Sequence, residues 1–280
     1  MSAADVKSFL TRHGLLARRD LGQNFLVDET LAARLVELSG VEPGDRVIEI
    51  GTGLGVLTRA LAKCAQHVVT IEIDSGIVRA LRADAALPDN VELVHADALE
   101  FDLAECVGAR TEPVRLVANL PYNVSAPLLR RCLDLRDRLE DWSVMLQSEV
   151  ATRLLARPGS RDYGSFSVLH GLTVAFSKAM ELSPNCFFPV PKVHSTFVRI
   201  TPLDTPLVDD GELRQVEQVV RAAFAKRRKT LVNSLRAGTF GTDHSPDELK
   251  AALSRCAIEP LARAESLSPE QLLALARELR

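Results

Sequence analysis

Asn119, Leu120, Pro121 and Tyr122 stand together directly after a short apolar run, residues 116–118, that is typical of a buried strand. The asparagine amide can donate and accept hydrogen bonds, and proline fixes the backbone and lacks an N–H. The Leu120 carbonyl is then a candidate acceptor, and the Tyr122 ring can lie against another flat group. This combination suits a planar ring that carries an amine, such as adenine. Taken alone, it fits equally well a strand that ends in an ordinary proline turn.

A glycine-rich loop follows another apolar run, at residues 46–50. Gly51, Gly53 and Gly55 alternate with other residues, and such a loop lets the backbone turn sharply and lets a ligand come close. No Gly-Lys-Ser/Thr follows, so this is not a phosphate loop, and the spacing differs from the G-x-G-x-x-G of dinucleotide sites. The loop favours a ligand other than a nucleoside triphosphate or a dinucleotide.

Two acids follow the next two apolar runs. Glu72 comes about 20 residues after Gly51, where an acid can accept from both hydroxyls of a ribose. Asp97 can accept from the exocyclic amine of an adenine, or it can cap a helix. Either acid alone is compatible with ordinary surface charge. Together with the glycine loop, they suit an adenosine ligand without phosphates, and S-adenosylmethionine fits.

These residues need a framework that brings several strand ends together. Strands are predicted at residues 46–50, 68–73, 91–96, 115–120 and 143–147, helices at 56–64 and 75–86, and a later strand pair at 173–182 and 196–200. Strands that alternate with helices indicate an α/β fold with a mainly parallel sheet covered on both faces. In such sheets ligands bind beyond the carboxyl ends of the strands, where the candidate residues stand.

The C-terminal part has a different pattern. Residues 201–210 are polar and interrupted by proline, as in a linker, and helices are predicted beyond them at residues 212–235, 246–256 and 269–278. We therefore expect a first domain at residues 1–203, with a basic N-terminal arm at 1–28, and a small all-helical domain at residues 204–280.

Charge distribution is more informative than net charge. The net charge of −3 would by itself argue against a nucleic-acid partner. Residues 221–236, however, hold six basic side chains and no acid, and residues 1–19 hold four basic side chains and one acid. Such patches suit local contact with phosphates, although a solvated helix face would look the same. The candidate RNA-binding residues are Arg221, Lys226, Arg227, Arg228 and Lys229.

Composition excludes several classes of protein. Hydrophobic residues make up 46% and charged residues 25%, as in a globular protein, and no apolar run approaches the length of a membrane span. The N-terminus lacks the apolar core of a secretory signal. The five cysteines lie far apart without a CxxC pair, which predicts reduced thiols in a cytoplasmic protein. We expect no disulfide framework, no metal site and no membrane partner.

Seven segments, in order, resemble one family over nearly the whole chain. The family is that of the ribosomal RNA adenine dimethyltransferases, in particular the bacterial members that act on small-subunit 16S RNA. The segments are residues 22–28, 49–58, 119–125, 145–150, 157–164, 187–195 and 224–230. One such motif would be weak evidence, and seven in order are strong evidence. The resemblance implies a Rossmann-like class I S-adenosylmethionine-dependent methyltransferase core with a seven-stranded sheet.

The resemblance also implies roles for matching residues on the cofactor side. Glu72 would hold the ribose of S-adenosylmethionine, and Asp97 would hold its adenine. Asn24, Leu26 and Gly51 would line the methionine end. The remaining cofactor-binding candidates are Gly53, Ile73, Ala98 and Asn119.

On the target side, the resemblance implies a site for one adenine of RNA. Asn119 and the Leu120 carbonyl would hold the amine, beside Pro121. Tyr122 and Phe187 would sandwich the base, with Phe188 a less favoured neighbour. The sequence departs from the family pattern twice. Thr52 replaces a usual proline, which alters loop stiffness more than chemistry, and His194 replaces a usual aspartate, so no polar role carries over to it.

The implied reaction is dimethylation of two adjacent adenosines near the 3′ end of 16S rRNA, by a monomer acting late in 30S assembly. Three alternatives stay open. A relative of the same fold methylates large-subunit RNA and confers macrolide resistance, although the long C-terminal segment favours the small-subunit branch. A non-catalytic RNA-binding or transcription factor could descend from the same fold. A DNA adenine methyltransferase also uses an Asn-Pro-aromatic motif.

Overall fold

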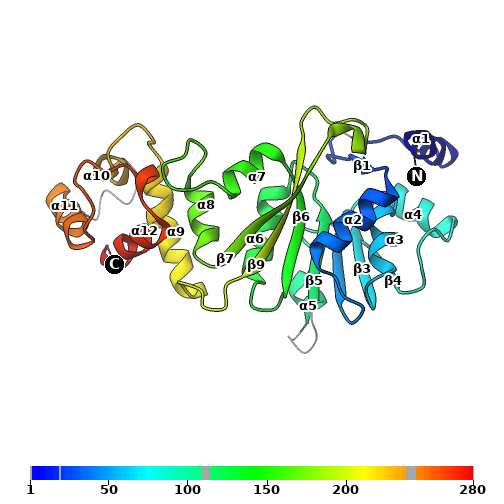
Figure 1. The fold of residues 1–280 in the computed structure, drawn as a ribbon, viewed down its shortest axis with the longest axis horizontal. Coiled ribbons are helices and arrows are strands. Elements are labelled where there is room, and N and C mark those ends of the chain that lie inside the picture. The colour runs from blue at the N-terminus through cyan, green and yellow to red at the C-terminus, as the bar shows by residue number, and fades with distance from the viewer. Residues whose placement is uncertain (1, 19, 109–113, 238–243, 280) are drawn as a thin grey trace. The chain divides into compact units, whose positions relative to one another are not determined.

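The computed structural model describes residues 2–18, 20–108, 114–237 and 244–279 (Figure 1). Contacts divide the chain into two compact units, Met1–Ser148 with Ser177–Pro202, and Glu149–Phe176 with Leu203–Arg280. The strands are β1 Phe25–Leu26, β2 Arg46–Ile50, β3 His67–Glu72, β4 Val91–His95, β5 Val114–Asn119, β6 Asp141–Gln147, β7 Val174–Leu182, β8 Phe187–Phe188 and β9 Ser195–Pro202. The helices are α1 Ala3–Arg12, α2 Glu29–Ser39, α3 Val56–Ala62, α4 Ser75–Ala83, α5 Leu103–Val107, α6 Ser125–Asp134, α7 Ser148–Leu154, α8 Ser165–Gly171, α9 Asp210–Phe224, α10 Leu231–Leu235, α11 Pro246–Arg255 and α12 Pro269–Glu278.

The main sheet has seven strands in the order β4-β3-β2-β5-β6-β9-β7. From β4 to β6 all neighbours are parallel, and β9 runs antiparallel to β6. This confirms the predicted fold class, and every strand predicted from the apolar runs is present. Because the order reverses between β2 and β5, the carboxyl ends of these strands diverge there and leave room for a ligand.

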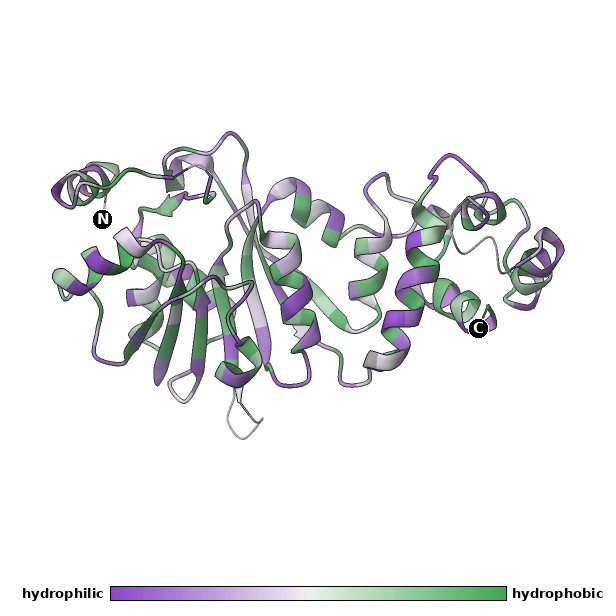
Figure 2. Ribbon diagram, turned by 180° about the vertical axis from the view of Figure 1, so that it is seen from behind, coloured by the Kyte–Doolittle hydropathy of each residue, from purple (hydrophilic) through white to green (hydrophobic). Residues whose placement is uncertain are grey.

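Both faces of the sheet are covered. Val47, Ile48, Glu49 and Ile50 of β2 are consecutive and all buried, although successive side chains of a strand point to opposite faces. Val47 and Val68 share one core cluster with residues of α2 and α3. Figure 2 shows the hydrophobic colouring that runs along the central strands. The sheet is therefore a rigid base for side chains placed at its carboxyl edge.

The N-terminal segment is held against the first unit by a two-stranded ribbon. Phe25 of β1 pairs with Phe188 of β8, and Leu26 pairs with Phe187, in antiparallel register. Before this ribbon, α1 starts with a capping box in which the Ser2 side chain and Asp5 exchange hydrogen bonds. The ribbon fixes the path of the residues just before Phe25.

The prediction of one continuous helix over residues 212–235 is wrong, because this segment of the second unit forms two helices. Helix α9 ends at Phe224, a turn follows, and α10 begins at Leu231. The Lys226 amide donates to the Ser234 hydroxyl at 3.1 Å, and the Lys229 amide donates to the Lys226 carbonyl at 2.8 Å. In a continuous helix Lys226 and Lys229 would face each other three positions apart, and such like-charge pairs are destabilising, so a turn suits this basic run better.

The second unit also includes Glu149–Phe176, which the sequence analysis assigned to the first domain. Tyr163 shows the reason, because its hydroxyl donates to the Leu267 carbonyl at 3.0 Å and its ring meets the Phe224 ring edge-on at 5.8 Å. The second boundary of this unit, between Pro202 and Leu203, lies within a residue of the predicted one. That this unit contacts RNA stays a prediction.

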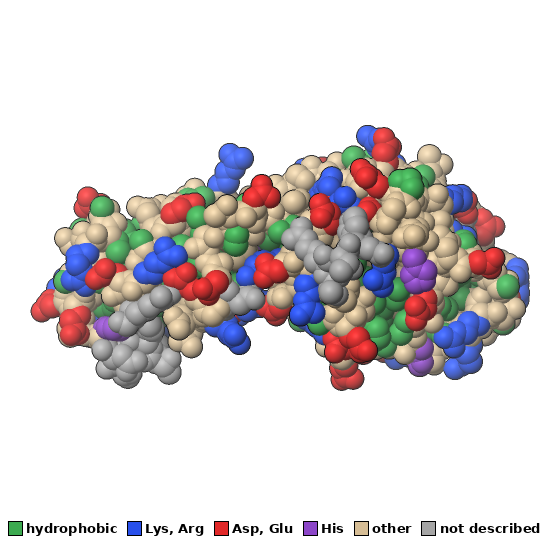
Figure 3. Space-filling model, turned by 90° about the horizontal axis from the view of Figure 1, so that it is seen from below, with side chains coloured by type: hydrophobic (Ala, Val, Ile, Leu, Met, Phe, Trp, Pro, Cys, Tyr) green, Lys and Arg blue, Asp and Glu red, His purple; other side chains and the backbone are tan. Residues whose placement is uncertain are grey.

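The described residues contain no helix that is long and apolar enough to cross a membrane. The five cysteines are free thiols. On the face drawn in Figure 3, Lys and Arg side chains are interspersed with Asp and Glu. The surface therefore has mixed charge there, in keeping with the small net charge of −3.

Candidate active site

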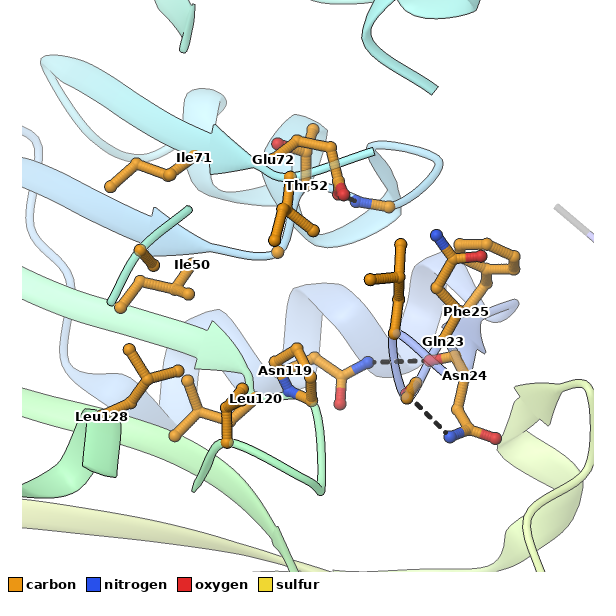
Figure 4. A pocket seen from close by; sticks show the side chains of 18 of the residues that line it. Gln23, Asn24, Phe25, Ile50, Thr52, Ile71, Glu72, Asn119, Leu120 and Leu128 are labelled. Atoms are coloured by element: carbon orange, nitrogen blue, oxygen red, sulfur yellow. Dashed lines mark hydrogen bonds between the residues drawn. The ribbon is translucent and has the colours of Figure 1, made fainter. Parts of the chain in front are cut away.

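A single cavity in the first unit collects most of the predicted site residues (Figure 4). It opens at the carboxyl ends of β2, β3, β4 and β5, at the point where the strand order reverses. The residues that line it are 21–26, 50–54, 56, 57, 71–73, 96–99, 119–124 and 128. All nine cofactor-binding candidates are among them, and so are Asn119, Leu120, Pro121 and Tyr122. Phe187 is not among them.

The glycine loop takes a conformation that other residues rarely adopt. Gly51, Gly53 and Gly55 have φ angles of 84°, 53° and 75°. The Gly55 amide closes the turn by donating to the Thr52 carbonyl at 2.9 Å. A Cβ added at Gly53 would lie 3.1 Å from Cδ1 of Phe25. The loop thus keeps its backbone at the cavity wall, where a ligand can approach closely.

Glu72 is fixed at the end of β3 by two backbone donors. Its Oε2 accepts from the Gly53 amide at 2.8 Å, and its Oε1 accepts from the Asp74 amide at 2.9 Å. Burial raises the pKa of the Glu72 carboxyl, and these two amides oppose the rise. Each carboxylate oxygen keeps a further lone pair, so the pair can accept from two adjacent hydroxyls.

Asp97 is oriented in a similar way at the end of β4. Its Oδ1 accepts from the Leu99 amide at 2.8 Å, which leaves Oδ2 as a candidate acceptor for an amine. Ile73 lies between the two acids in sequence and is 42% exposed, although it is a large apolar residue. An exposed apolar surface beside two carboxylates suits the face of a purine. Ala98 is buried and closes this end of the cavity.

A hydrogen bond from its amide nitrogen orients the side chain of Asn119. Its Nδ2 donates to the Asn24 carbonyl at 3.0 Å, and the Asn24 side chain in turn donates to the Gly22 carbonyl at 3.1 Å, as Figure 4 shows. With the nitrogen engaged, Oδ1 of Asn119 is the atom that can accept from a substrate amine. The same bond ties the N-terminal segment to the end of β5.

Tyr122 is anchored through its hydroxyl. Its oxygen lies 2.7 Å from the Ser195 hydroxyl, and Ser195 is fully buried at the start of β9. Burial raises the pKa of the Tyr122 phenol. The ring therefore cannot turn freely and presents a fixed surface beside Asn119.

Phe187 lies outside the cavity. Its ring is 1% exposed and packs in the core cluster that contains Leu26. Phe188 is half-buried, and the Lys7 ammonium lies 5.5 Å from the centre of its ring. The structure therefore brings Tyr122 to the cavity without Phe187, and the stacking role of Phe187 stays a prediction that requires its ring to move.

The buried carboxyl of Glu49 belongs to a hydrogen-bond network that reaches the glycine loop. The hydroxyls of Thr58 and Thr70 each donate to Oε2 of Glu49 at 2.6 Å. Thr52, which also lines the cavity, lies 2.7 Å from the Thr70 hydroxyl. Burial is the main cause that raises the pKa of Glu49 to about 8, so the carboxyl is mostly neutral at pH 7. Thr52 therefore links the loop to this network, a link that proline could not make.

The candidate RNA-binding residues lie in the second unit, on the last turn of α9 and the turn after it. Arg221 pairs with Glu217 at 2.7 Å, and Arg227 lies 3.7 Å from Glu265. Lys226, Arg228 and Lys229 are exposed, and no ion pair joins them to an acid in the described part of the chain. These three cations are available for phosphates.

Sequence reasoning missed three side chains that hold the site together. The Gln23 amide donates to Asp74 at 2.9 Å, and its oxygen accepts from the Arg18 amide at 2.8 Å. Ser195 anchors Tyr122, and Arg131 holds the loop after β4. Gln23 and Ser195 lie within quoted motifs, so attention to every polar motif position could have found them. Arg131 carries no sequence signal.

Comparison with known proteins decides the family. The family described as "Ribosomal RNA adenine dimethylase" matches residues 14–280. The chain belongs to this family. Its curated relatives include "Ribosomal RNA small subunit methyltransferase A" of Geobacter sulfurreducens, which is 41% identical over 95% of this chain and 96% of the relative. The protein of the same name from Shouchella clausii is 38% identical over 99% of this chain and 94% of the relative.

Solved structures of two other methyltransferases resemble this fold. A dimethyladenosine transferase from Plasmodium falciparum has a TM-score of 0.76 at 22% identity, covering 90% of this chain and 95% of its own. The 23S rRNA methyltransferase ErmE has a TM-score of 0.68 at 28% identity, covering 91% of this chain and 99% of its own. The fold of this family member is therefore shared well beyond the small-subunit enzymes.

The residues of the cavity fit S-adenosylmethionine. Glu72 offers two oxygens for a ribose, Ile73 and Asp97 offer an apolar surface and an acceptor for an adenine, and the Gly51 turn leaves space at the methionine end. Among the described residues, no group of three or more His, Cys, Asp or Glu side chains could hold a metal ion.

Proposed function

We propose that this protein transfers methyl groups from S-adenosylmethionine to the exocyclic amines of two adjacent adenosines near the 3′ end of 16S rRNA, within an assembling 30S subunit. The observation that carries the proposal is the Asn119 amide, whose bond to the Asn24 carbonyl at 3.0 Å leaves its oxygen to accept an amine in a cavity that also holds Glu72 and Asp97. The small-subunit enzymes at 38–41% identity support this choice of substrate. We propose that the protein acts as a monomer in the cytoplasm.

Asn119 and Leu120 would act by alignment. S-adenosylmethionine supplies an electrophilic methyl group when bound. An adenine amine is a poor nucleophile, because its lone pair is delocalised into the ring. Hydrogen bonds from the amine to Oδ1 of Asn119 and to the Leu120 carbonyl favour a pyramidal nitrogen whose lone pair points at the methyl. Such positioning can contribute several kcal/mol, up to roughly 7–11 in ideal cases.

No strong general base is required at this site. The amine nitrogen becomes acidic as it gains the methyl, so its proton can leave to water. The motif from Asn119 to Tyr122 contains no acid, and the pocket acids Glu72 and Asp97 have one oxygen or both engaged by backbone amides. These acids serve binding in the proposal, and Asn119 serves the transfer.

Tyr122 would hold the target base after it leaves its stack. Stacking on an aromatic ring contributes about 1–3 kcal/mol per base and so offsets part of the cost of unstacking. The Ser195 hydroxyl, 2.7 Å from the Tyr122 oxygen, fixes the ring in one orientation. Phe187 is buried, so its proposed place on the other face of the base requires the ribbon of β1 and β8 to open or its ring to rotate outward.

The second unit would bind the RNA backbone. Its exposed turn presents Lys226, Arg227, Arg228 and Lys229, and Arg221 lies one helical turn before them. A chain with a net charge of −3 can bind RNA through such a local patch. We assign this unit the RNA-contacting role and the first unit the methyl transfer.

A second candidate is methylation of large-subunit RNA, which the likeness to the 23S rRNA methyltransferase ErmE favours. The two candidates are separated by incubating the protein and labelled S-adenosylmethionine with unmethylated 30S particles or with naked 23S RNA. We expect label in the 30S particles, and mass spectrometry of the digested RNA should show dimethyladenosine. Label in 23S RNA alone would indicate that the substrate is large-subunit RNA instead.

The same assay tests two further alternatives. A DNA substrate that accepts label in place of RNA would indicate a DNA methyltransferase. Absence of label from every substrate, with RNA binding retained, would indicate a non-catalytic RNA-binding factor. The intact set of Glu72, Asp97 and Asn119 in one cavity argues against the loss of catalysis, and the DNA substrate decides the other alternative.

A further inference from the structure

Arg131 holds the loop that carries Asp97. It lies on α6, and its guanidinium donates from Nη1 to the Ala98 carbonyl at 2.5 Å and from Nη2 to the Phe101 carbonyl at 2.7 Å. The loop it holds contributes Asp97, Ala98 and Leu99 to the cavity wall. Arg131 itself does not line the cavity, so any effect on a ligand passes through this loop.

The Ala98 carbonyl and the Leu99 amide belong to the same planar peptide unit. Arg131 binds the carbonyl side of this peptide, and the amide side donates to Oδ1 of Asp97 at 2.8 Å. The direction of the Asp97 carboxylate therefore depends on the orientation of a peptide that Arg131 fixes. A charged donor on the carbonyl also polarises the peptide and strengthens the bond from its N–H.

The Phe101 carbonyl gives the second fixed point. The amides of Glu100 and Phe101 both donate to the Asp97 carbonyl, at 3.0 Å and 2.8 Å, which closes the loop into one turn. The two terminal nitrogens of the Arg131 guanidinium thus bind the turn on both sides of Leu99, at the carbonyls of Ala98 and Phe101. A planar guanidinium spans two carbonyls in a way that a lysine ammonium does not.

We propose that Arg131 is a positioning residue for recognition of the cofactor's adenine ring, acting through the Ala98–Leu99 peptide on the Asp97 carboxylate. The inference rests on the proposed function, because it assigns the ligand of Asp97 to an adenine amine. Helix α6 begins at Ser125, shortly after Tyr122, so the same helix follows the target-binding motif and clamps the adenine-binding loop.

The experiment measures S-adenosylhomocysteine binding by calorimetry in the full chain. Arg131→Met keeps much of the side-chain volume and removes both hydrogen bonds, and we expect its Kd to rise about tenfold. Arg131→Lys can hold one carbonyl and should fall between Arg131→Met and the unchanged protein. Arg130→Met is the matched control, because Arg130 is the preceding residue of α6 and pairs with Asp134 at 3.2 Å; its Kd should not change.

A double-mutant cycle with Asp97→Ala separates positioning from general support of the fold. If Arg131 acts through Asp97, Arg131→Met should have no further effect on the Kd once Asp97 is alanine. The inference would be wrong if Arg131→Met raised the Kd by the same factor with and without Asp97, or if it left the Kd unchanged. Either result would leave the proposed function standing. An unchanged protein that does not bind S-adenosylhomocysteine would overturn the proposed function, and the inference with it.

Discussion

The cofactor side and the target side of the cavity differ in how completely they are assembled. On the cofactor side, Glu72 is held by two backbone amides and Asp97 by one, at 2.8–2.9 Å, and the glycine turn is closed. On the target side, Asn119 and Tyr122 are each held by one side-chain hydrogen bond, and Phe187 lies buried outside the cavity.

This difference indicates an order of events. A site held by several backbone bonds needs little rearrangement, and its ligand loses little affinity to ordering the protein. The target side is held by two side-chain bonds, one of which ties Asn119 to the N-terminal segment through Asn24. We infer that the cofactor binds a preformed site, whereas the site for the target base is completed only when the base binds. Substitutions on the two sides should therefore affect different measurements.

The largest effect is expected for Asn119→Ala. It removes the acceptor that aims the amine, and misplacement of a reacting group by about 1 Å can lower the rate about 100-fold or more. S-adenosylhomocysteine should still bind with nearly unchanged affinity, because the backbone bonds of Glu72 and Asp97 remain. Single-turnover methyl transfer and calorimetry measure the two effects. Full activity in this variant would sink the assigned mechanism.

Asn123→Ala is the matched control for this variant. Its amide also ties the N-terminal segment, by donating to the Asp20 carbonyl at 3.1 Å, and it lines the same cavity. If Asn119 served only to tether that segment, the two variants would lose similar activity. We expect Asn123→Ala to keep most of the transfer rate.

The next effect is expected for Glu72→Ala and appears in binding. Loss of two hydrogen bonds between a charged group and the ribose should raise the Kd for S-adenosylhomocysteine about 100-fold. The transfer rate at saturating cofactor should change far less, because the target side keeps its contacts. Glu37→Ala, an exposed acid paired with Arg34 on α2, is the control and should change neither. An unchanged Kd in Glu72→Ala would refute the ribose role.

The cofactor side was also the easier side to predict from the sequence. Its residues stand directly after apolar runs, and a parallel sheet with short connections brings such positions to one edge whatever the helices do. Gly51, Glu72 and Asp97 therefore reached the cavity as expected. The resemblance added the N-terminal residues Asn24 and Leu26, which no strand pattern places there.

The unpredicted features depend on contacts between distant segments. The burial of Phe187 follows from the pairing of β1 with β8, a ribbon of two residues per strand that has no periodicity to read. Over a shorter separation of eight positions, the break of the basic helix after Phe224 is stabilised by the hydrogen bond from the Lys226 amide to the Ser234 hydroxyl. Arg131 reaches the Ala98 carbonyl across 33 positions of the chain, so sequence alone carries no sign of that bond.

The smallest effect is expected for loss of the hydroxyl that anchors Tyr122. Tyr122→Phe keeps the ring and removes the bond to Ser195, so we expect kcat/KM for the RNA to fall only several-fold, in line with about 1 kcal/mol for one hydrogen bond. Ser195→Ala should reproduce this loss, and the double variant should lose no more than either one, because both remove the same bond. Tyr122→Ala removes the stacking surface itself and should lose more than Tyr122→Phe. If Tyr122→Phe were as inactive as Tyr122→Ala, the hydroxyl and not the ring would be the functional group, and the target side would be as firmly preset as the cofactor side.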